Sequence, residues 1–242
     1  MKLTIATLVL ASCAMTAQAH QVWLEQDTQG ATLYFGEYGD NLREASPGLL
    51  DKFVKPVGRK LSAKGAEPLP LSKTATGFVL AGRAARGESL VAEEPAYPIS
   101  ERRQGDAVTR SLYVPAARLV TDLSKQEPAL TLDLVPTGQG SQGSAQVQAF
   151  YKGKPLPKAK VSVVTASGWA REYHADDAGR LTVNLPWQGT YVLELAHTDT
   201  AGGERGAEKW DRATYVTSLT LVRAEGLPAL PAPQPAAPNP AD

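Results

Sequence analysis

The sequence predicts an all-β protein of two sandwich-like domains, the second Ig-like or transthyretin-like, followed by a disordered proline-rich tail. Three observations favour this fold class. Apolar residues recur with a period of two along most of the chain. No window of about 11 residues carries an apolar stripe of helical period. Short glycine-rich stretches separate the alternating segments, as turns and linkers do in all-β proteins.

The first domain is expected to span residues 20–137. Its predicted strands lie at 31–36, 78–81, 89–93, 108–114 and 130–135. The segment 41–54 is the exception to the strand pattern, because Ser46-Pro47 favours a short helical turn with proline at its first position.

The second domain is expected to span residues 145–223. A linker, GQGSQGS at 138–144, carries no apolar side chain and separates it from the first domain. The predicted strands lie at 145–151, 160–166, 180–185, 190–196 and 214–222. The sequence DDAGR at 176–180 opens with residues typical of a hairpin turn. Residues 224–242 are rich in proline and lack aromatic side chains, which predicts a disordered tail.

Residues 1–19 have the pattern of a secretory signal peptide. A basic start precedes an apolar run at 3–11, and Ala17-Gln18-Ala19 forms a small-x-small cleavage site. We therefore expect an exported protein whose first residue is His20. The alternative is a lipoprotein, in which Cys13 would be lipidated and kept as the first residue, and His20 would be internal.

The composition of the mature chain excludes several classes of function. It would hold 24 basic and 25 acidic residues, so no positive surplus points to nucleic acid or to an anionic membrane surface. No segment reaches the roughly 18 apolar residues needed to span a membrane. The only cysteine and both methionines lie in the predicted signal, which excludes disulfides and sulfur ligands. A transition-metal site would have to use imidazole, amine and carboxylate groups.

His20 is the first candidate ligand, because a histidine at the amino terminus offers two nitrogens to one ion. Its free amine and Nδ1 close a six-membered chelate, which suits Cu(II) or Ni(II) in square or tetragonal fields. One opposing imidazole would complete a histidine brace. His197 is the candidate for that imidazole, because it follows a predicted strand and precedes a polar loop. His174, beside Asp176 and Asp177, is a weaker candidate. On general grounds each of these could instead be an ordinary surface histidine.

An acidic group adds a possible oxygen ligand. Glu37, Asp40 and Glu44 lie within YFGEYGDNLRE at 34–44, close to the end of a predicted strand. Glu37 is the carboxylate we expect to contact a metal. The alternative is a solvated loop in which Arg43 pairs with one of these carboxylates.

The chain also resembles a known family. The resemblance rests on HQVWLE at 20–25, YFGEY at 34–38, NLREASPG at 41–48, GKPLPKAKV at 153–161, DDAGR at 176–180, GTYVL at 189–193, Ala196-His197 and YVTSLT at 215–220. These segments are similar to a bacterial periplasmic family that is defined by a domain of unknown function and catalogued with nickel- and cobalt-uptake systems. Its second half resembles a carboxypeptidase-regulatory-like sandwich. The resemblance implies periplasmic handling of a transition metal, with His20 and His197 at the positions that the motifs mark.

We therefore expect a periplasmic binding or delivery protein that holds one Ni(II) or Cu(II) ion per chain, with Co(II) as a further candidate, and serves a membrane metal transporter. Its expected ligands are His20 and His197, with His174 or Glu37 as an additional contact. Two alternatives remain open at this stage. One is a copper oxidase that cleaves polysaccharide with the same histidine brace, and the other is a metal-free adhesion or scaffolding module.

Overall fold

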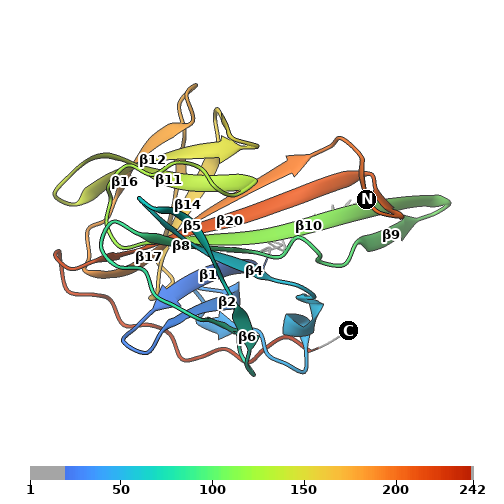
Figure 1. Ribbon diagram of the computed structural model, residues 1–242, viewed down its shortest axis with the longest axis horizontal. Helices are drawn as coiled ribbons and strands as arrows, with labels where there is room; N and C mark the ends of the chain where they lie inside the picture. The colour runs from blue at the N-terminus through green and yellow to red at the C-terminus, as the bar shows by residue number, and fades with distance from the viewer. Residues whose placement is uncertain (1–19, 241–242) are drawn as a thin grey trace, which may run out of the picture.

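The computed structural model describes residues 20–240, and this part of the chain is built almost entirely of β-strands (Figure 1). The predicted all-β, sandwich-like fold class is therefore confirmed. The signal peptide predicted for residues 1–19, and with it the lipoprotein alternative at Cys13, lies outside the described residues. Between residues 20 and 240, no helix is long and apolar enough to cross a membrane.

The amino-terminal residues form a small antiparallel sheet, which we call sheet A. Its strands are β1 (Gln21–Gln26), β2 (Ala31–Glu37), β3 (Leu42–Arg43), β6 (Leu71–Lys73) and β7 (Phe78–Leu80). β1 was not predicted, because Val22, Trp23 and Leu24 do not alternate with polar residues. All three are buried, so β1 is covered on both faces.

A nine-stranded sheet, sheet B, crosses the middle of the molecule and contains strands from both halves of the sequence. Its strands, in spatial order, are β15 (Ala170–His174), β14 (Lys160–Thr165), β17 (Gly189–Asp199), β20 (Arg212–Arg223), β10 (Ala107–Val120), β8 (Ser89–Glu93), β4 (Val57–Ser62) and β5 (Gly65–Leu69), with β9 (Ser100–Gln104) paired to β10. The parallel pairing of β10 with β20 joins the two halves directly. The structure thus differs from two domains in series, because both predicted domains share one sheet.

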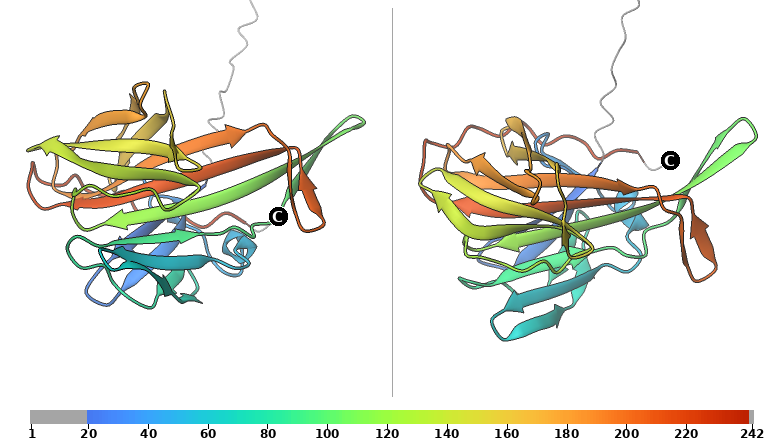
Figure 2. Two further views of the ribbon diagram at one scale, coloured as in Figure 1. Left: turned by 45° about the horizontal axis from the view of Figure 1, so that its top comes forward. Right: turned by 90° about the horizontal axis from the view of Figure 1, so that it is seen from above.

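A third sheet, sheet C, covers one face of sheet B. Its strands are β11 (Leu132–Ser141), β12 (Ser144–Tyr151), β13 (Lys154–Pro155) and β16 (Arg180–Asn184). Figure 2 shows sheet C on one side of the long strands β10 and β20 and the blue strands of sheet A on the other. The segment predicted as a linker at 138–144 is instead the end of the β11–β12 hairpin. Its glycines serve the turn, where Gly143 has a φ of +91°.

The turn predicted after β15 is present, but it does not close a hairpin. Asp176 accepts hydrogen bonds at Oδ1 from the backbone N–H groups of Ala178 and Arg180, both at 2.8 Å. The strands that it connects belong to different sheets, since β15 pairs with β14 and β16 pairs with β12. This crossover from one layer to the other is typical of a sandwich. A small separate hairpin, β18 (Gly203–Arg205) and β19 (Glu208–Trp210), follows β17.

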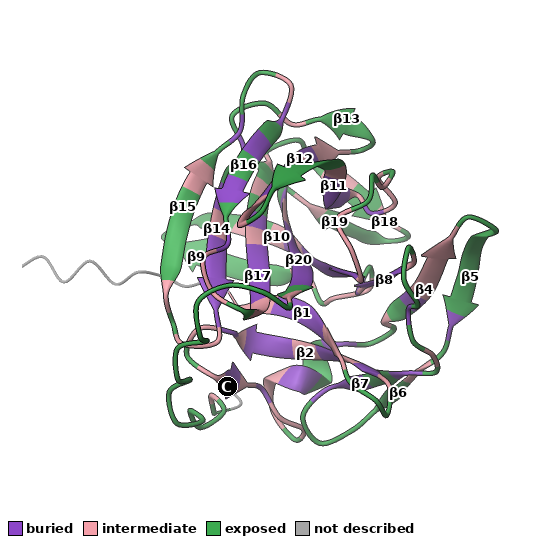
Figure 3. Cartoon of the chain, turned by 90° about the vertical axis from the view of Figure 1, so that its left-hand side faces the viewer, coloured by how far each residue is buried: buried purple, intermediate pink, exposed green. Residues whose placement is uncertain are grey.

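Two large apolar cores hold these layers together, and buried residues line the strands that face them (Figure 3). The core between sheets B and C contains Leu134, Val147, Val163, Leu193 and Leu219. The core between sheet A and the β8–β10 side of sheet B contains Val22, Leu33, Phe35, Leu90 and Leu119. Alternation along β17 places Leu193 and Leu195 on the sheet C side, and Val192 against Trp23 of sheet A.

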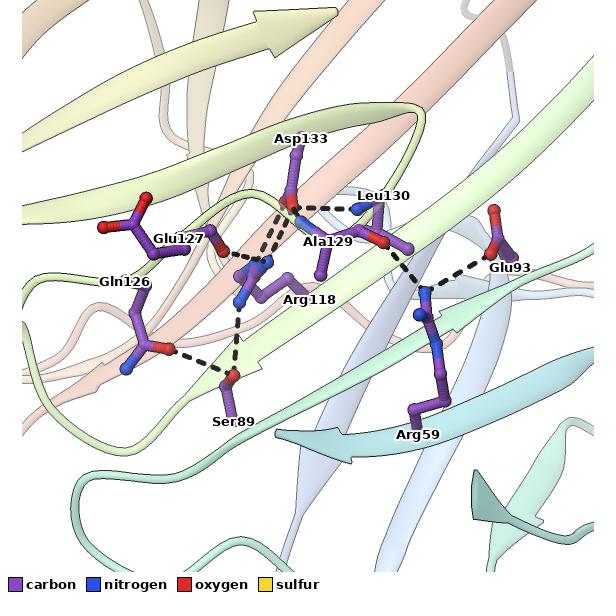
Figure 4. A network of polar contacts seen from close by, with 9 residues as sticks. All are labelled: Arg59, Ser89, Glu93, Arg118, Gln126, Glu127, Ala129, Leu130 and Asp133. Atoms are coloured by element: carbon purple, nitrogen blue, oxygen red, sulfur yellow. Dashed lines mark hydrogen bonds and ion pairs between the residues drawn. The ribbon is translucent and has the colours of Figure 1, made fainter. Parts of the chain in front are cut away.

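A buried ion pair joins β10 of sheet B to β11 of sheet C (Figure 4). Arg118 donates from Nε to Oδ1 of Asp133 at 3.0 Å and from Nη2 to Oδ2 at 2.6 Å, and both side chains are fully buried. Arg118 also donates to Ser89 and to the carbonyl of Glu127. This network fixes the connection between β10 and β11, because Asp133 in turn accepts from the backbone N–H of Leu130.

The only helical turn of the described chain is a 3-10 helix at Leu49–Lys52. It lies within the predicted segment 41–54, although it begins after Gly48 rather than at Pro47. The Asp51 carboxylate accepts a hydrogen bond from the Gly48 N–H at 2.9 Å, which explains the start of the turn.

The proline-rich tail follows a defined path over the surface, in contrast to the disorder that its composition predicts. Leu227 forms a bridge with Trp187, and Ala236 forms a parallel bridge with Leu42 beside β3. The tail then ends close to the start of β1, where Asn239 lies beside His20.

Candidate functional site

The candidate site lies where β1 begins, at one end of sheet A. Gln21 pairs with Gly36, so the next step of the ladder places His20 beside Glu37. Residues that are opposite one another in an antiparallel pair share a face. The His20 ring lies on the Phe35 ring of that face, with 5.1 Å between their centroids. The strand pairing therefore brings a histidine and an acidic segment together.

Glu44 holds the imidazole of His20 from one side. Nε2 of His20 lies 2.5 Å from Oε1 of Glu44, whose side chain is fully buried, whereas the His20 side chain is 24 % exposed. An ionised carboxylate only accepts hydrogen bonds, so the ring proton belongs on Nε2. Glu44 is brought here by its own backbone, because its N–H donates to the carbonyl of Phe35 at 2.8 Å.

Two more contacts fix the position of His20. The hydroxyl of Tyr113, from β10, donates to the backbone carbonyl of His20. Burial raises the pKa of Tyr113 well above its usual range, so this hydroxyl keeps its proton. Asn239 of the tail lies across the pair, with Nδ2 3.0 Å from Nε2 of His20 and 2.7 Å from Oε1 of Glu44. The ring and the backbone of His20 are thus both held.

The surroundings of His20 are acidic. Burial raises the pKa of Glu37 from its ordinary value, and the Asp40 carboxyl adds to this through a hydrogen bond, while the charge of His20 opposes it. Glu194 of β17 is more deeply buried, and this burial raises its pKa to about 7. A hydrogen bond from Gln21 lowers that pKa and the charge of Glu37 raises it. Two carboxyl groups of elevated pKa therefore lie beside the start of β1.

Arg43 does not neutralise this acidic group. Its guanidinium pairs with Glu25 at 3.1 Å and lies over the Tyr34 ring, 4.7 Å from the centroid. Arg43 is paired with Gly36, and successive residues of a strand point to opposite faces. Arg43 therefore lies on one face of sheet A, and its neighbours Glu37 and Glu44 lie on the other.

The donor set suits an amino-terminal metal chelate. With Nε2 donating to Glu44, the ring nitrogen left for a metal is Nδ1, which is the nitrogen that closes a six-membered chelate with the amine of a terminal histidine. Metal-bound histidines commonly donate their other ring N–H to a carboxylate, which orients the ring and raises the basicity of the ligand. The residues present therefore fit a divalent transition metal, with Glu44 orienting the ring and Glu37 as a neighbouring oxygen donor. No group of three or more histidine, cysteine, aspartate or glutamate side chains within residues 20–240 is arranged around a common metal position, so the amine would have to supply one ligand.

The structure does not bring His197 to His20. His197 follows Leu193 and Leu195 on the face of β17 that packs on sheet C, and its ring lies 4.4 Å from that of Tyr151, centroid to centroid. Glu194, on the opposite face, is the β17 residue that bonds to Gln21 beside the site. Sheet B therefore lies between the two histidines.

His174 is also apart from the site. It is exposed near the end of the edge strand β15, opposite Lys160 of β14. The nearby aspartates contact other groups. Asp176 accepts a hydrogen bond from the backbone N–H of Arg180, and Asp177 pairs with Lys158 at 2.9 Å.

Glu194 and Asn239 are among the residues of the site that were not anticipated from the sequence. Glu194 interrupts the apolar run YVLELA at 191–196, and a carboxylate inside such a strand is a signal for a buried polar contact. Asn239 carries no comparable signal, because it lies in a segment of prolines and alanines.

The described chain is an all-β protein in which a buried glutamate holds the histidine that directly precedes the first strand. Comparison with family models places the chain in one family. Residues 17–199 match the family described as a domain of unknown function, DUF4198, and the chain belongs to it. A search of curated proteins found no match to the chain.

Proposed function

We propose that the protein binds one Ni(II) or Cu(II) ion at His20 in the periplasm and delivers it to a metal-uptake system. The proposal requires export and cleavage after Ala19, which would free the amine of His20. Cobalt is a further candidate ion, because the resemblance noted above connects the family with nickel- and cobalt-uptake systems. A membrane transporter would be the receiving partner.

The observation that carries the proposal is the hydrogen bond between His20 Nε2 and the buried carboxylate of Glu44. It occupies Nε2, so Nδ1 is the ring nitrogen that would serve a metal. Two nitrogens in a six-membered chelate suit the square or tetragonal fields that Cu(II) and Ni(II) prefer. Glu37 would add an oxygen ligand, and solvent can complete the set because His20 is partly exposed.

The geometry favours binding over the polysaccharide oxidase. A histidine brace needs a second imidazole opposite the chelate, and His197 lies beyond sheet B, against Tyr151. The aromatic side chains around His20 do not form a flat exposed platform, since Phe35 and Tyr113 pack in the core between sheets A and B. A metal-free scaffold is the remaining alternative, and it is an outcome of the test below.

The test is titration of Ni(II) and Cu(II) into three proteins and one control by calorimetry. The first begins at His20, the second carries one extra glycine before His20, and the third is His20→Ala. We expect the extension and the substitution each to weaken binding more than about 100-fold, or roughly 2.8 kcal/mol. His174→Ala is the matched control and should bind like the parent. Equal affinity of the extended protein would exclude the amine as a ligand, and no binding by the parent would favour the scaffold.

A further inference from the structure

The carboxyl-terminal tail makes its most specific contacts at the candidate site. Asn239 donates from its backbone N–H to Oε2 of Glu44 at 3.1 Å and from Nδ2 to Oε1 at 2.7 Å. Both oxygens of one buried carboxylate are thus bound by one residue of the tail. The only other donor to this carboxylate in the described structure is Nε2 of His20.

The part of the tail that leads to Asn239, residues 233–238, is held lightly. Asn41 donates from Nδ2 to the carbonyl of Pro233 at 3.0 Å and accepts at its own carbonyl from the N–H of Ala236 at 3.3 Å. Residues 224–238 are exposed, and Asn239 is half-buried. A segment with few buried contacts opens at a low cost in free energy. Prolines reduce the number of conformations that the free tail can adopt, which lowers the entropy cost of docking.

From these contacts we propose that residues 233–240 form a releasable latch on the metal site. This inference rests on the proposed function. The docked tail fixes the Glu44 carboxylate, and Glu44 fixes the His20 ring in the orientation that presents Nδ1. Asn239 is therefore a positioning residue, because it reaches the ion only through Glu44 and His20. Release of the tail frees Glu44 and the ring, and so promotes release of the ion.

The latch couples docking of the tail to binding of the metal ion. By thermodynamic linkage, each of these two equilibria must affect the other by the same factor. If the docked tail strengthens metal binding by a given factor, bound metal strengthens tail docking by the same factor. A protein that hands on its ion gains from such a coupling, because a partner that draws the tail away also weakens the site.

Tail docking is tested first in the metal-free, full-length mature protein by amide hydrogen exchange. The reporters are the N–H groups of Ala236 and Asn239, which donate to Asn41 and Glu44 respectively. We expect both to exchange more slowly than amides of an unstructured peptide. Glu44→Gln should speed their exchange, because glutamine offers one acceptor oxygen in place of the two that bind Asn239. Random-coil exchange in the unsubstituted protein would overturn the latch, whatever the protein does with metal.

The coupling is tested with Asn239→Ala, Asn239→Asp and the control Gln234→Ala, titrated with Ni(II) and Cu(II). Loss of an outer-shell partner costs about 10- to 100-fold in metal affinity. We expect about a tenfold loss for Asn239→Ala, a larger loss for Asn239→Asp because it places a second negative charge beside Glu44, and none for Gln234→Ala. Bound metal should slow exchange at Asn239 by a factor that matches the affinity lost when the tail is released. Unchanged or tighter binding by Asn239→Asp would overturn the latch.

Failure of the proposed function would give a different pattern. If the unsubstituted protein binds neither ion, the function is excluded, and the latch is judged by the His20 ring in the metal-free protein. Nuclear Overhauser contacts between the ring protons of His20 and Phe35 should weaken in Asn239→Asp. Contacts of equal strength would show that the tail does not position His20.

Discussion

Nε2 of His20 lies 2.5 Å from Oε1 of Glu44, a carboxylate with no exposed surface. A buried charge is costly unless it is paired and hydrogen-bonded, and Glu44 has three donors to satisfy it. The pair therefore determines which nitrogen of the His20 ring carries the proton, and with it which nitrogen can bind a metal.

Substitution of Glu44 by glutamine should lower the affinity for Ni(II) or Cu(II) by about 10- to 100-fold, because the ring loses its charged acceptor. Calorimetric titration measures this loss. Glu67→Gln is the control, since Glu67 pairs with Lys60 at an exposed site. Equal affinities of Glu44→Gln and the parent would show that Glu44 does not orient a ligand.

Substitution of His197 by alanine should leave metal affinity unchanged, because sheet B separates His197 from His20. The variant should lose only the contact between the His197 and Tyr151 rings. Titration beside His20→Ala measures the difference. A loss as large as that of His20→Ala would restore the brace predicted from the sequence and contradict the arrangement described above.

Glu194 should make the stability depend on pH. Burial raises its pKa from 4.5 to about 7, so the folded protein binds more protons than the unfolded chain between these values. Stability contributed by this group is therefore lost as the pH rises from about 4.5 to about 7. Glu194→Gln removes this dependence and should raise the Tm by roughly 2–6 °C at pH 8, with little change at pH 4. Thermal unfolding at both pH values measures it, and an equal shift at each would contradict this origin.

Arg118→Met should destabilise the fold by about 3–5 kcal/mol, because it leaves the buried Asp133 carboxylate without its charged partner. Denaturant unfolding gives this difference. Arg110→Met is the control, because its partner Glu101 is largely exposed and such pairs contribute about 0–1 kcal/mol. A loss for Arg118→Met no larger than that of the control would show that the buried network does not stabilise the β10–β11 connection.

Several strands could be predicted close to their observed bounds. Residues 89–93 were predicted with the bounds of β8, and residues 190–196 lie within β17. β1 could not be predicted from alternation, since Val22, Trp23 and Leu24 are all buried. The apolar alternation also could not predict that both halves of the chain share sheet B. The parallel pairing of β10 with β20 joins residues about a hundred positions apart.

The candidate site could be predicted in part. His20 and the acidic segment 34–44 were singled out, and strand pairing brings them together. The separation of His197 from His20 depends on which face of β17 carries His197. A shift of one residue in register would move His197 to the opposite face. Asn239 could not be found, because its contact depends on the path of a segment whose composition predicts no fixed structure.

The most direct test of the account is the native mass of the protein exported to the periplasm and purified without chelator. We expect a chain that begins at His20 and carries one nickel or copper ion. The same protein with one extra residue before His20 should have the mass of the metal-free chain. A mature chain that begins at His20 and stays metal-free when both ions are offered would contradict the account.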